Sequence, residues 1–561
     1  MATPLSTDGE EEAPESIDGL AKSLPSMVHE GVQAADRRCG SPCLYLKVTV
    51  VEGKALTGEM AITRTPARIQ GFVVHIQFNG QRARTVRLAK CSVEPKFGEV
   101  FVFPLAEDVP STPASWASFL QWDMPLHLCL TREAAPRNPP VSDATVSQRS
   151  RPDCSSIPGK QKMALQMAGF GLDSWKVEGS KELVGIGEVD WRRGLVSSTP
   201  GRSANANGDM KEACDSRAHT DADAGGVVVA VPLSSATPDS IFCPVGGILH
   251  LRLEVLASPV DVEIPFTTAD VERVMDLQES THAEAQMDFF LYAKAWWEQY
   301  SSISPSHAKR EVKIFAKDDQ GRNFNVCSFL SPAQYSSLRL LETPRHAARF
   351  VSLLPYTHPK CVGQQCSEVW KSHHAFLASG AGGCTDHALL LCSLLLGFGL
   401  NAYVCVGEAI GGAATRAGLA GRGLGAGERH FMKEEDMGRR TWVWVCTFSG
   451  PFSQENCTFW ESLTGLQYKV EDMRKRQART VGGKRRGKAA STSSSHKRFG
   501  EAPAAGNHHF SRIVCMFSHR EFYANKQVDD HVDCTRLDLS DPALWKRMDP
   551  SRLCQVHGTV L

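Results

Sequence analysis

The stretch that decides the fold is GAGGCTDHALLLCSLLLGFGLNAYVCVG, which runs from Gly380 to Gly407. After its first cysteine, apolar residues recur at the i, i+3, i+4, i+7 spacing of one helical face. These positions are Ala388, Leu391, Cys392, Leu395 and Leu396. Gly397 and Gly399 end the helix, and the run LNAYVCVG after them is typical of a strand. Cys384 thus occupies the first turn of a buried helix, where backbone N–H groups and the helix dipole stabilise a thiolate. It is either a nucleophile or a small core residue.

A thiolate nucleophile also needs a histidine that transfers protons and an acid or amide that orients this histidine. The order G-x-C-x-x-x-A, a Trp-Val strand and a strand end with an acid resembles the transglutaminase-like fold, whose Trp-Val strand begins with histidine. The corresponding runs here are RRTWVWVCTF and CTFWESLTG. The resemblance gives triad positions Cys384, Arg440 and Glu461. Because arginine stays protonated near neutral pH, it cannot replace the histidine, so we expect a degenerate triad and assign no catalytic residue.

Two nearby histidines are weaker candidates for the missing base. His430 lies in the run ERHFMKEEDMG, ten residues before Arg440. A loop would have to carry His430 to Cys384 and hold it within roughly 0.5 Å of the productive catalytic geometry. We therefore do not favour His430 as the base. His387 lies one turn beyond the cysteine, and we expect a surface or capping histidine there. Asp386 is expected to complement the helix N-terminus.

The first third of the chain alternates apolar and polar residues in short runs separated by turn signals, which predicts an antiparallel sandwich. These runs are CLYLKVTVV, GFVVHIQF, PLHLCLT, LVGIGEVDW and GGILHLRLEVL. The run EPKFGEVFVFP, from Glu94 to Pro104, resembles the P-x-F-x-E-x-F-x-F strand of C2 domains, and the resemblance covers residues 42–258.

Calcium-binding C2 domains hold the ion with several loop aspartates, because Ca²⁺ takes six to eight oxygen ligands. The corresponding loop, VEGKALTGEMAITRTPARIQ, has no aspartate, and its only acids are Glu52 and Glu59. We therefore expect no calcium, no other metal and no cofactor. Weak calcium-independent membrane contact through this domain stays open, although no loop rich in basic and aromatic residues supports it.

The sequence predicts a multidomain chain: an all-β C2-type sandwich, a helical connector and an α+β transglutaminase-like (papain-like) domain. The expected boundaries are 1–41 for a disordered acidic head, 42–258 for the C2 domain with long insertions, 266–307 for the connector, 308–550 for the transglutaminase-like domain, and 551–561 for a tail. Polar, Gly- and Ser-rich insertions are expected near 133–180, 197–240, 408–430 and 472–507. An aromatic stripe in the connector, from Phe289 to Tyr300, is interpreted as packing between the modules.

The composition of the chain argues against several classes of function. Lys+Arg and Asp+Glu are both 62, so charge gives no reason to expect nucleic acid as a partner. Of the 18 cysteines, none forms a C-x-x-C pair, which argues against a zinc ribbon. The chain begins without an apolar signal segment, and a reducing, intracellular, soluble protein is expected. The basic run 474–488 is expected to be a solvated loop, with acidic partners, RNA or tubulin tails as alternatives.

Longer motifs resemble the centrosomal protein of 76 kDa family, in order, over residues 42–550. They include KAWWEQY, LLETPRHAARFVSLLPY, TFWESLTGLQY and LDLSDPALWKRM. The family pairs a C2 domain with a transglutaminase-like, peptidase-like domain and is similar to C2-bearing transition-zone proteins of cilia. The resemblance implies a non-catalytic scaffold of the cytoplasm and cytoskeleton, at the centrosome, centriole or basal body. It would restrain centriole duplication by binding centriolar or ciliary proteins.

The chain differs from the family pattern beyond Arg440. Family members carry a helical segment where this chain has its short acidic head, and they continue past the position of Leu561. The alternative to a scaffold is an active cysteine peptidase, deamidase or transglutaminase that uses Cys384. The sequence leaves the oligomeric state open.

Overall fold

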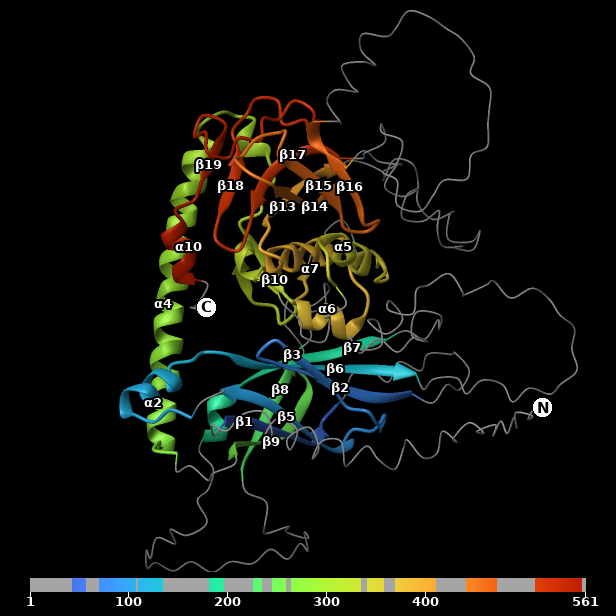
Figure 1. Ribbon diagram of the computed structural model, residues 1–561, viewed down its shortest axis with the longest axis vertical. Coiled ribbons are helices and arrows are strands. Elements are labelled where there is room, and N and C mark those ends of the chain that lie inside the picture. The colour runs from blue at the N-terminus through green and yellow to red at the C-terminus, as the bar shows by residue number, and fades with distance from the viewer. Residues whose placement is uncertain are drawn as a thin grey trace, which may run out of the picture.

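The computed structural model describes residues 43–56, 70–106, 109–134, 181–195, 226–234, 245–258, 264–333, 341–357, 369–409, 440–471 and 510–556. Its N-terminal part is a β-sandwich and its C-terminal part mixes helices with a second large sheet (Figure 1). A long helix, α4, runs beside both (Figure 1). The expected acidic head, most of the expected insertions and the end of the tail lie outside the described residues.

The described strands of the sandwich form one antiparallel path, β3-β2-β6-β7-β8-β9-β1-β5, with β4 beside β2. Strands β7 and β8 pair only at Ile186 and Ser234. The path of strands therefore divides there into the two layers of the sandwich, with the apolar core between them. The predicted sandwich is confirmed. The strands are β1 Cys43–Lys54, β2 Gln70–Phe78, β3 Gln81–Arg84, β4 Ala89–Lys90, β5 Lys96–Ala106, β6 Pro125–Ala134, β7 Glu182–Asp190, β8 Val227–Ser234 and β9 Val245–Ser258.

Strand β5 carries the C2-like motif, and its glutamate fastens a neighbouring loop. Glu99 accepts hydrogen bonds from the backbone N–H groups of Val86 and Arg87, at 2.8 and 3.0 Å. Phe103 and Leu105 of the same strand are buried in the core. The motif therefore contributes both apolar packing and a polar anchor.

Strand β8 corrects one sequence prediction. The region 197–240 was expected to be an insertion, but Val227–Ser234 pairs with β9 over its whole length, from Val227 opposite Leu253 to Ser234 opposite Val245. The short alternating run VVVAVPLS is flanked by polar segments on both sides. Composition averaged over the whole region conceals this strand.

The C-terminal part is built on the antiparallel sheet β16-β15-β14-β13-β17-β18-β19, with α7 packed against β13 and β14 and α5 packed against α7 (Figure 1). A smaller sheet has the order β11-β10-β12. The strands are β10 Phe315–Asp318, β11 Asn323–Asn325, β12 Val369–Trp370, β13 Asn401–Ala409, β14 Arg440–Phe448, β15 Cys457–Glu461, β16 Leu466–Lys469, β17 Phe510–Phe517, β18 Phe522–Asn525 and β19 Trp545–Arg547. The helices are α5 Pro344–Ser352, α6 His373–Ser379, α7 Cys384–Gly397 and α10 Pro550–Val556, with 3₁₀ turns at His307–Lys309 and Val326–Phe329.

Helix α4 spans Thr268–Ser301 and belongs to both cores. It begins with a capping box in which Thr267 and Asp270 satisfy each other's backbone N–H groups. Val271, in its first turn, is buried in the sandwich core, whereas Phe289, Ala293, Trp296 and Tyr300 are buried in the core of the C-terminal part. The aromatic stripe therefore packs within the second domain, which corrects its interpretation as packing between modules. Among the described helices, none, α4 included, is both long and apolar enough to cross a membrane.

A buried arginine fastens the sandwich to α4. Arg192 lies in the 3₁₀ turn Trp191–Leu195 and is 2% exposed. Its Nε donates to Asp190 at 2.9 Å, and its Nη1 donates to the Leu120 carbonyl, at the end of α2 (Pro113–Leu120), and to Gln278 Oε1 at 2.5 Å. Because Gln278 belongs to α4, the arginine joins three elements.

We expect Arg192→Met to lower the free energy of unfolding of the sandwich by about 3 kcal/mol, because it leaves the Asp190 carboxylate without its buried partner. Calorimetry of the first unfolding transition measures this loss. Arg193→Met is the matched control, since Arg193 is exposed in the same turn and its loss should cost less than about 0.5 kcal/mol. Equal losses in the two variants would contradict the role of Arg192.

Candidate functional site

The cysteine that the sequence singles out is the first residue of helix α7, as predicted. The helix start is fastened by Asp386, whose Oδ2 accepts the backbone N–H of Gly383 at 2.9 Å. Its Oδ1 accepts the backbone N–H of Lys371 at 3.0 Å. The predicted role of Asp386 at the helix N-terminus is therefore confirmed. Burial raises the pKa of this carboxyl, against the lowering effect of the Lys371 ammonium and the two N–H donors.

Of the expected surface or capping roles, the surface role is wrong because His387 is fully buried, and the ring instead contacts the residue that caps the helix. Its Nδ1 lies 2.7 Å from the carbonyl oxygen of Gly383, the residue that caps the helix, and its Nε2 lies 3.1 Å from the carbonyl oxygen of Leu354. Burial lowers the pKa of His387. Each ring nitrogen faces a backbone carbonyl oxygen, and the neutral ring donates its single N–H to one of the two. The imidazole is therefore held by the backbone and is badly placed to exchange a proton with Cys384.

The three triad positions lie on α7, β14 and β15. Cys384 is partly buried, and it packs against an apolar cluster that includes Trp444 of β14 and Phe459 of β15. Arg440 is the first residue of β14, and its backbone lies opposite Ala409 of β13. Glu461 is buried at the end of β15. The side chain of Arg440 and all of His430 lie outside the described residues.

Tyr468 of β16 lies close enough to Glu461 to feel its charge, and the sequence prediction missed it. It packs against the same apolar cluster as Cys384. Burial, helped by the Glu461 carboxylate, raises the pKa of Tyr468 to about 12. The phenol therefore stays protonated near neutral pH and is no substitute for a basic histidine. A lone tyrosine in a short strand gives no sequence signal of this placement.

The segment that leads to Cys384 rests on the sandwich. The His374 ring of α6 stacks on His127 of β6 at 4.2 Å between centroids, and His374 also contacts Gln77 of β2. Arg322, in the turn between β10 and β11, donates to Glu188 of β7 at 3.1 Å. Because α6 ends at Ser379, only four residues separate the end of this helix from Cys384. Sequence patterns do not reveal this contact, which joins two domains.

Among the described residues, no group of three or more His, Cys, Asp or Glu side chains is placed to hold a metal ion. The loop in which calcium-binding aspartates were sought, residues 51–70, lies mostly outside the described residues. The expectation of no calcium therefore stays a prediction.

Two models of one family match the chain. The CEP76 C2 domain matches residues 39–213, and the CEP76 peptidase-like domain matches residues 368–423 and 431–548. The first match covers most of the described sandwich, and the second contains α7, β14 and β15 and therefore all three triad positions. Together they cover more than half of the chain.

The curated relatives carry the same family name. The centrosomal protein of 76 kDa of Xenopus laevis is 35% identical over 311 residues, which cover 55% of this chain and 39% of that protein. The protein of the same name in Danio rerio is 28% identical over 541 residues, which cover 95% of this chain and 62% of that protein. A solved structure of the SMP, C2A and C2B domains of extended synaptotagmin 2 shows 16% identity and a TM-score of 0.18 over 40% of this chain and 30% of that one, which is too little for any conclusion.

The loop before Cys384 gives a matched pair of glycine substitutions. A Cβ atom on Gly382 would lie 2.5 Å from Asp386 Oδ2 and 2.7 Å from the Phe376 ring, whereas one on Gly383 would meet nothing closer than 3.9 Å. We expect Gly382→Ala to cost about 2 kcal/mol of folding stability through overpacking, and Gly383→Ala less than about 1 kcal/mol. Chemical denaturation measures both. Indistinguishable denaturation midpoints for the two variants would show that the loop adjusts at no cost in stability, which would contradict the prediction.

A buried histidine beside α7 predicts a pH dependence. Burial lowers the pKa of His373 from 6.5 to about 4, and its Nε2 lies 3.3 Å from Ser393 Oγ. Because the unfolded chain binds this proton more readily, the stabilisation is complete above pH 6.5 and is lost as the pH falls through 4. We expect His373→Gln to flatten the decline of the unfolding midpoint between pH 6.5 and 4. The control is His346→Gln, an exposed position that should leave the slope unchanged.

Proposed function

Because the chain belongs to the centrosomal protein of 76 kDa family, we propose that it is a centrosomal protein of the cytoplasm and cytoskeleton, acting at centrioles or basal bodies. The relatives that bear this name support the location. The proposed role is that of a non-catalytic scaffold that limits centriole duplication by binding other proteins. The region that the Xenopus laevis relative shares with this chain is 39% of the length of that protein.

The occupied imidazole of His387 is the observation that carries the non-catalytic part of this proposal. Acyl transfer to a thiol needs a group that takes and returns a proton near neutral pH. The family pattern puts Arg440 in the position of that group, and a guanidinium does not exchange protons there. His387, the imidazole nearest to Cys384 along the chain, has its Nδ1 and Nε2 at 2.7 and 3.1 Å from carbonyl oxygens.

A domain that has lost proton transfer can keep its binding surface, since ligand binding does not require the proton donor. The sandwich supports this reading because it contributes a second folded surface, fixed to the first through α4 and α6. A body of two domains in contact with each other suits simultaneous binding of two partners.

The alternative function is a cysteine peptidase, deamidase or transglutaminase. The observation in its favour is that Cys384 begins a 14-residue helix, the position that nucleophilic thiols favour. It would require an imidazole from another segment, and His430 is the candidate nearest to Arg440 in sequence.

We expect the Cys384→Ser variant to concentrate at centrosomes and to restore normal centriole numbers as well as the wild-type chain does. The measurement is fluorescence microscopy with centriole counting, in dividing cells from which the endogenous protein has been removed. The thiol-to-hydroxyl change keeps the size of the side chain, and an unchanged melting temperature verifies the fold. Loss of centriole control in both Cys384→Ser and His430→Ala, with intact folding, would establish the enzyme instead. Absence of the wild-type chain from centrosomes would refute the proposed location.

A further inference from the structure

The outward face of helix α4 exposes large apolar side chains, of which Phe290 also lies beside the ring of Phe315, with 6.0 Å between the centroids. Leu277, Met287, Phe290 and Leu291 are 66%, 61%, 52% and 58% exposed. Leu291 is two residues from both Phe289 and Ala293, and at 100° per residue it therefore lies on the opposite side of the helix from these buried positions. Scattered exposed apolar residues are common, but Met287, Phe290 and Leu291 are neighbours at i, i+3 and i+4.

Exposed acids surround these apolar residues. They are Asp276, Glu279, Glu284 and Asp288. Between residues 276 and 291 there is no lysine or arginine. None of the four carboxylates forms an ion pair with another described residue of the chain. We call the face formed by residues 276–291 the α4 strip.

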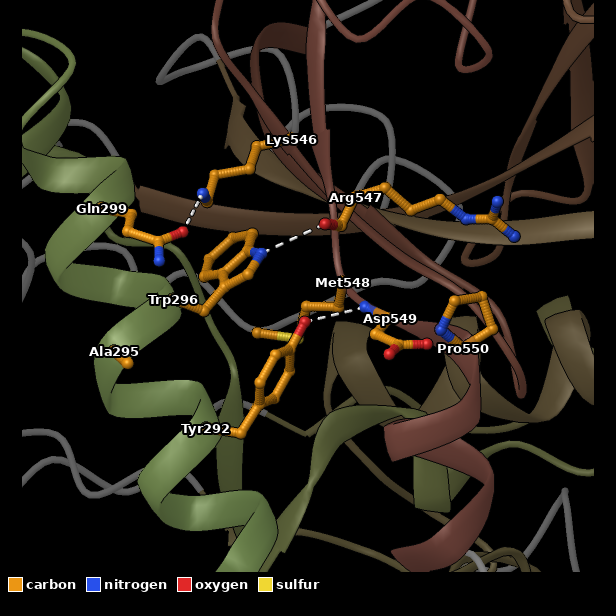
Figure 2. A pocket seen from close by; sticks show the side chains of 9 residues that line it. All are labelled: Tyr292, Ala295, Trp296, Gln299, Lys546, Arg547, Met548, Asp549 and Pro550. Atoms are coloured by element: carbon orange, nitrogen blue, oxygen red, sulfur yellow. Dashed lines mark hydrogen bonds between the residues drawn. The ribbon is translucent and has the colours of Figure 1, made fainter.

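The α4 strip runs into a cavity at its C-terminal end. The cavity has a volume of about 430 Å³. Its apolar lining comes from Tyr292, Ala295 and Trp296 of α4, from Met548 and from Pro550 at the start of α10. Its polar lining comes from Gln299, Lys546, Arg547 and Asp549, so the cations lie in the cavity and the unpaired carboxylates lie along the α4 strip. Figure 2 shows Tyr292 and Trp296 projecting from α4 toward Met548. Because Ala295 lies one turn after Leu291, the exposed apolar side chains are continuous with this cavity along one helix.

We propose that the α4 strip and this cavity form the docking site for an amphipathic helix of a partner protein, one with lysine or arginine beside large apolar side chains. The partner's apolar side chains would cover Met287, Phe290 and Leu291 and reach the cavity. Its cations would meet Glu284 and Asp288. This is the helix-in-groove mode of recognition, in which apolar anchors repeat at helical spacing. The inference rests on the proposed scaffold role in taking a protein as the partner.

The charge of the strip decides against other occupants. Nucleic acid and anionic membrane surfaces would be repelled by the four exposed carboxylates. A second copy that docked strip against strip would oppose eight carboxylates without a cation within either strip, and like charges facing one another at an interface are costly. A cationic amphipathic helix is complementary in both charge and apolar character.

The test selects helical peptides without assuming their sequence. Random 16-residue peptides displayed on phage are selected on the full-length chain, with counter-selection on the Met287→Ser/Leu291→Ser double variant. The expected peptides carry excess lysine or arginine and large apolar residues at i, i+3 or i+4. A synthetic copy of the most enriched peptide should bind the wild-type chain at least tenfold more tightly than the double variant or Glu284→Gln/Asp288→Asn, with weaker binding at higher salt.

The matched control is Val228→Ser/Glu94→Gln, which removes an exposed apolar side chain and an exposed acid from the sandwich and should bind the peptide like the wild type. The proposal fails if no peptide distinguishes the wild-type chain from the double variant, or if the enriched peptides have no excess positive charge. It also fails if peptides bind only after removal of the chain's own basic run 474–488, or if sedimentation velocity shows a wild-type dimer that Met287→Ser/Leu291→Ser converts to monomer. None of these readouts depends on centrosomal location, which the cell experiment tests separately.

Discussion

The continuity of helix α4 is the constraint on which the rest of the architecture depends. Its 34 residues span about 51 Å at the α-helical rise, and its two ends are buried in different cores. Arg192 ties one half to the sandwich through Gln278, and Tyr300 donates from the other half to the Asn525 carbonyl at 2.7 Å. Because the backbone hydrogen bonds of a helix resist bending, a helix that is fixed at both ends sets the distance between the two domains that hold it. Helix α6 adds a second connection between the two parts, because Ala375 and Ala378 pack against Cys129 and Ile186 of the sandwich.

Sequence patterns predicted the elements around Cys384 well because their signals are local. The apolar face after Cys384 predicted α7, the glycines at 397 and 399 predicted its end, the run LNAYVCVG predicted β13, and the resemblance to a Trp-Val strand predicted β14. The same patterns failed for His387. Nearly the whole circumference of α7 is buried, so a residue off the apolar face is still inside the protein. The Leu354 carbonyl that receives His387 is 33 residues away in sequence, and no local pattern encodes such a partner.

Some features of the candidate site follow from residue type or from position along the chain, and others depend on how distant segments pack. Residue type alone removes proton transfer from position 440, whatever the surrounding geometry. Position alone assigns Cys384 to the start of α7. The support of this site by the sandwich depends on His374 stacking over His127, a contact between residues 247 positions apart, and it emerges only when both domains are folded. Strand β8, which lies between polar segments, is likewise recognised by its pairing with β9 and not by the composition of its surroundings.

The two faces of α4 answer to different requirements. The inward face needs Phe289, Ala293 and Trp296 because their burial supplies the hydrophobic stabilisation that holds the helix on the second core. The outward face would meet the same structural needs with polar residues throughout, since its side chains are in water. Large exposed apolar residues there favour aggregation, and the surrounding carboxylates oppose it by mutual repulsion between copies. The surrounding carboxylates therefore oppose self-association of the apolar strip and at the same time favour a cationic partner. One charge pattern explains both why exposed apolar residues persist here and which partner they would bind.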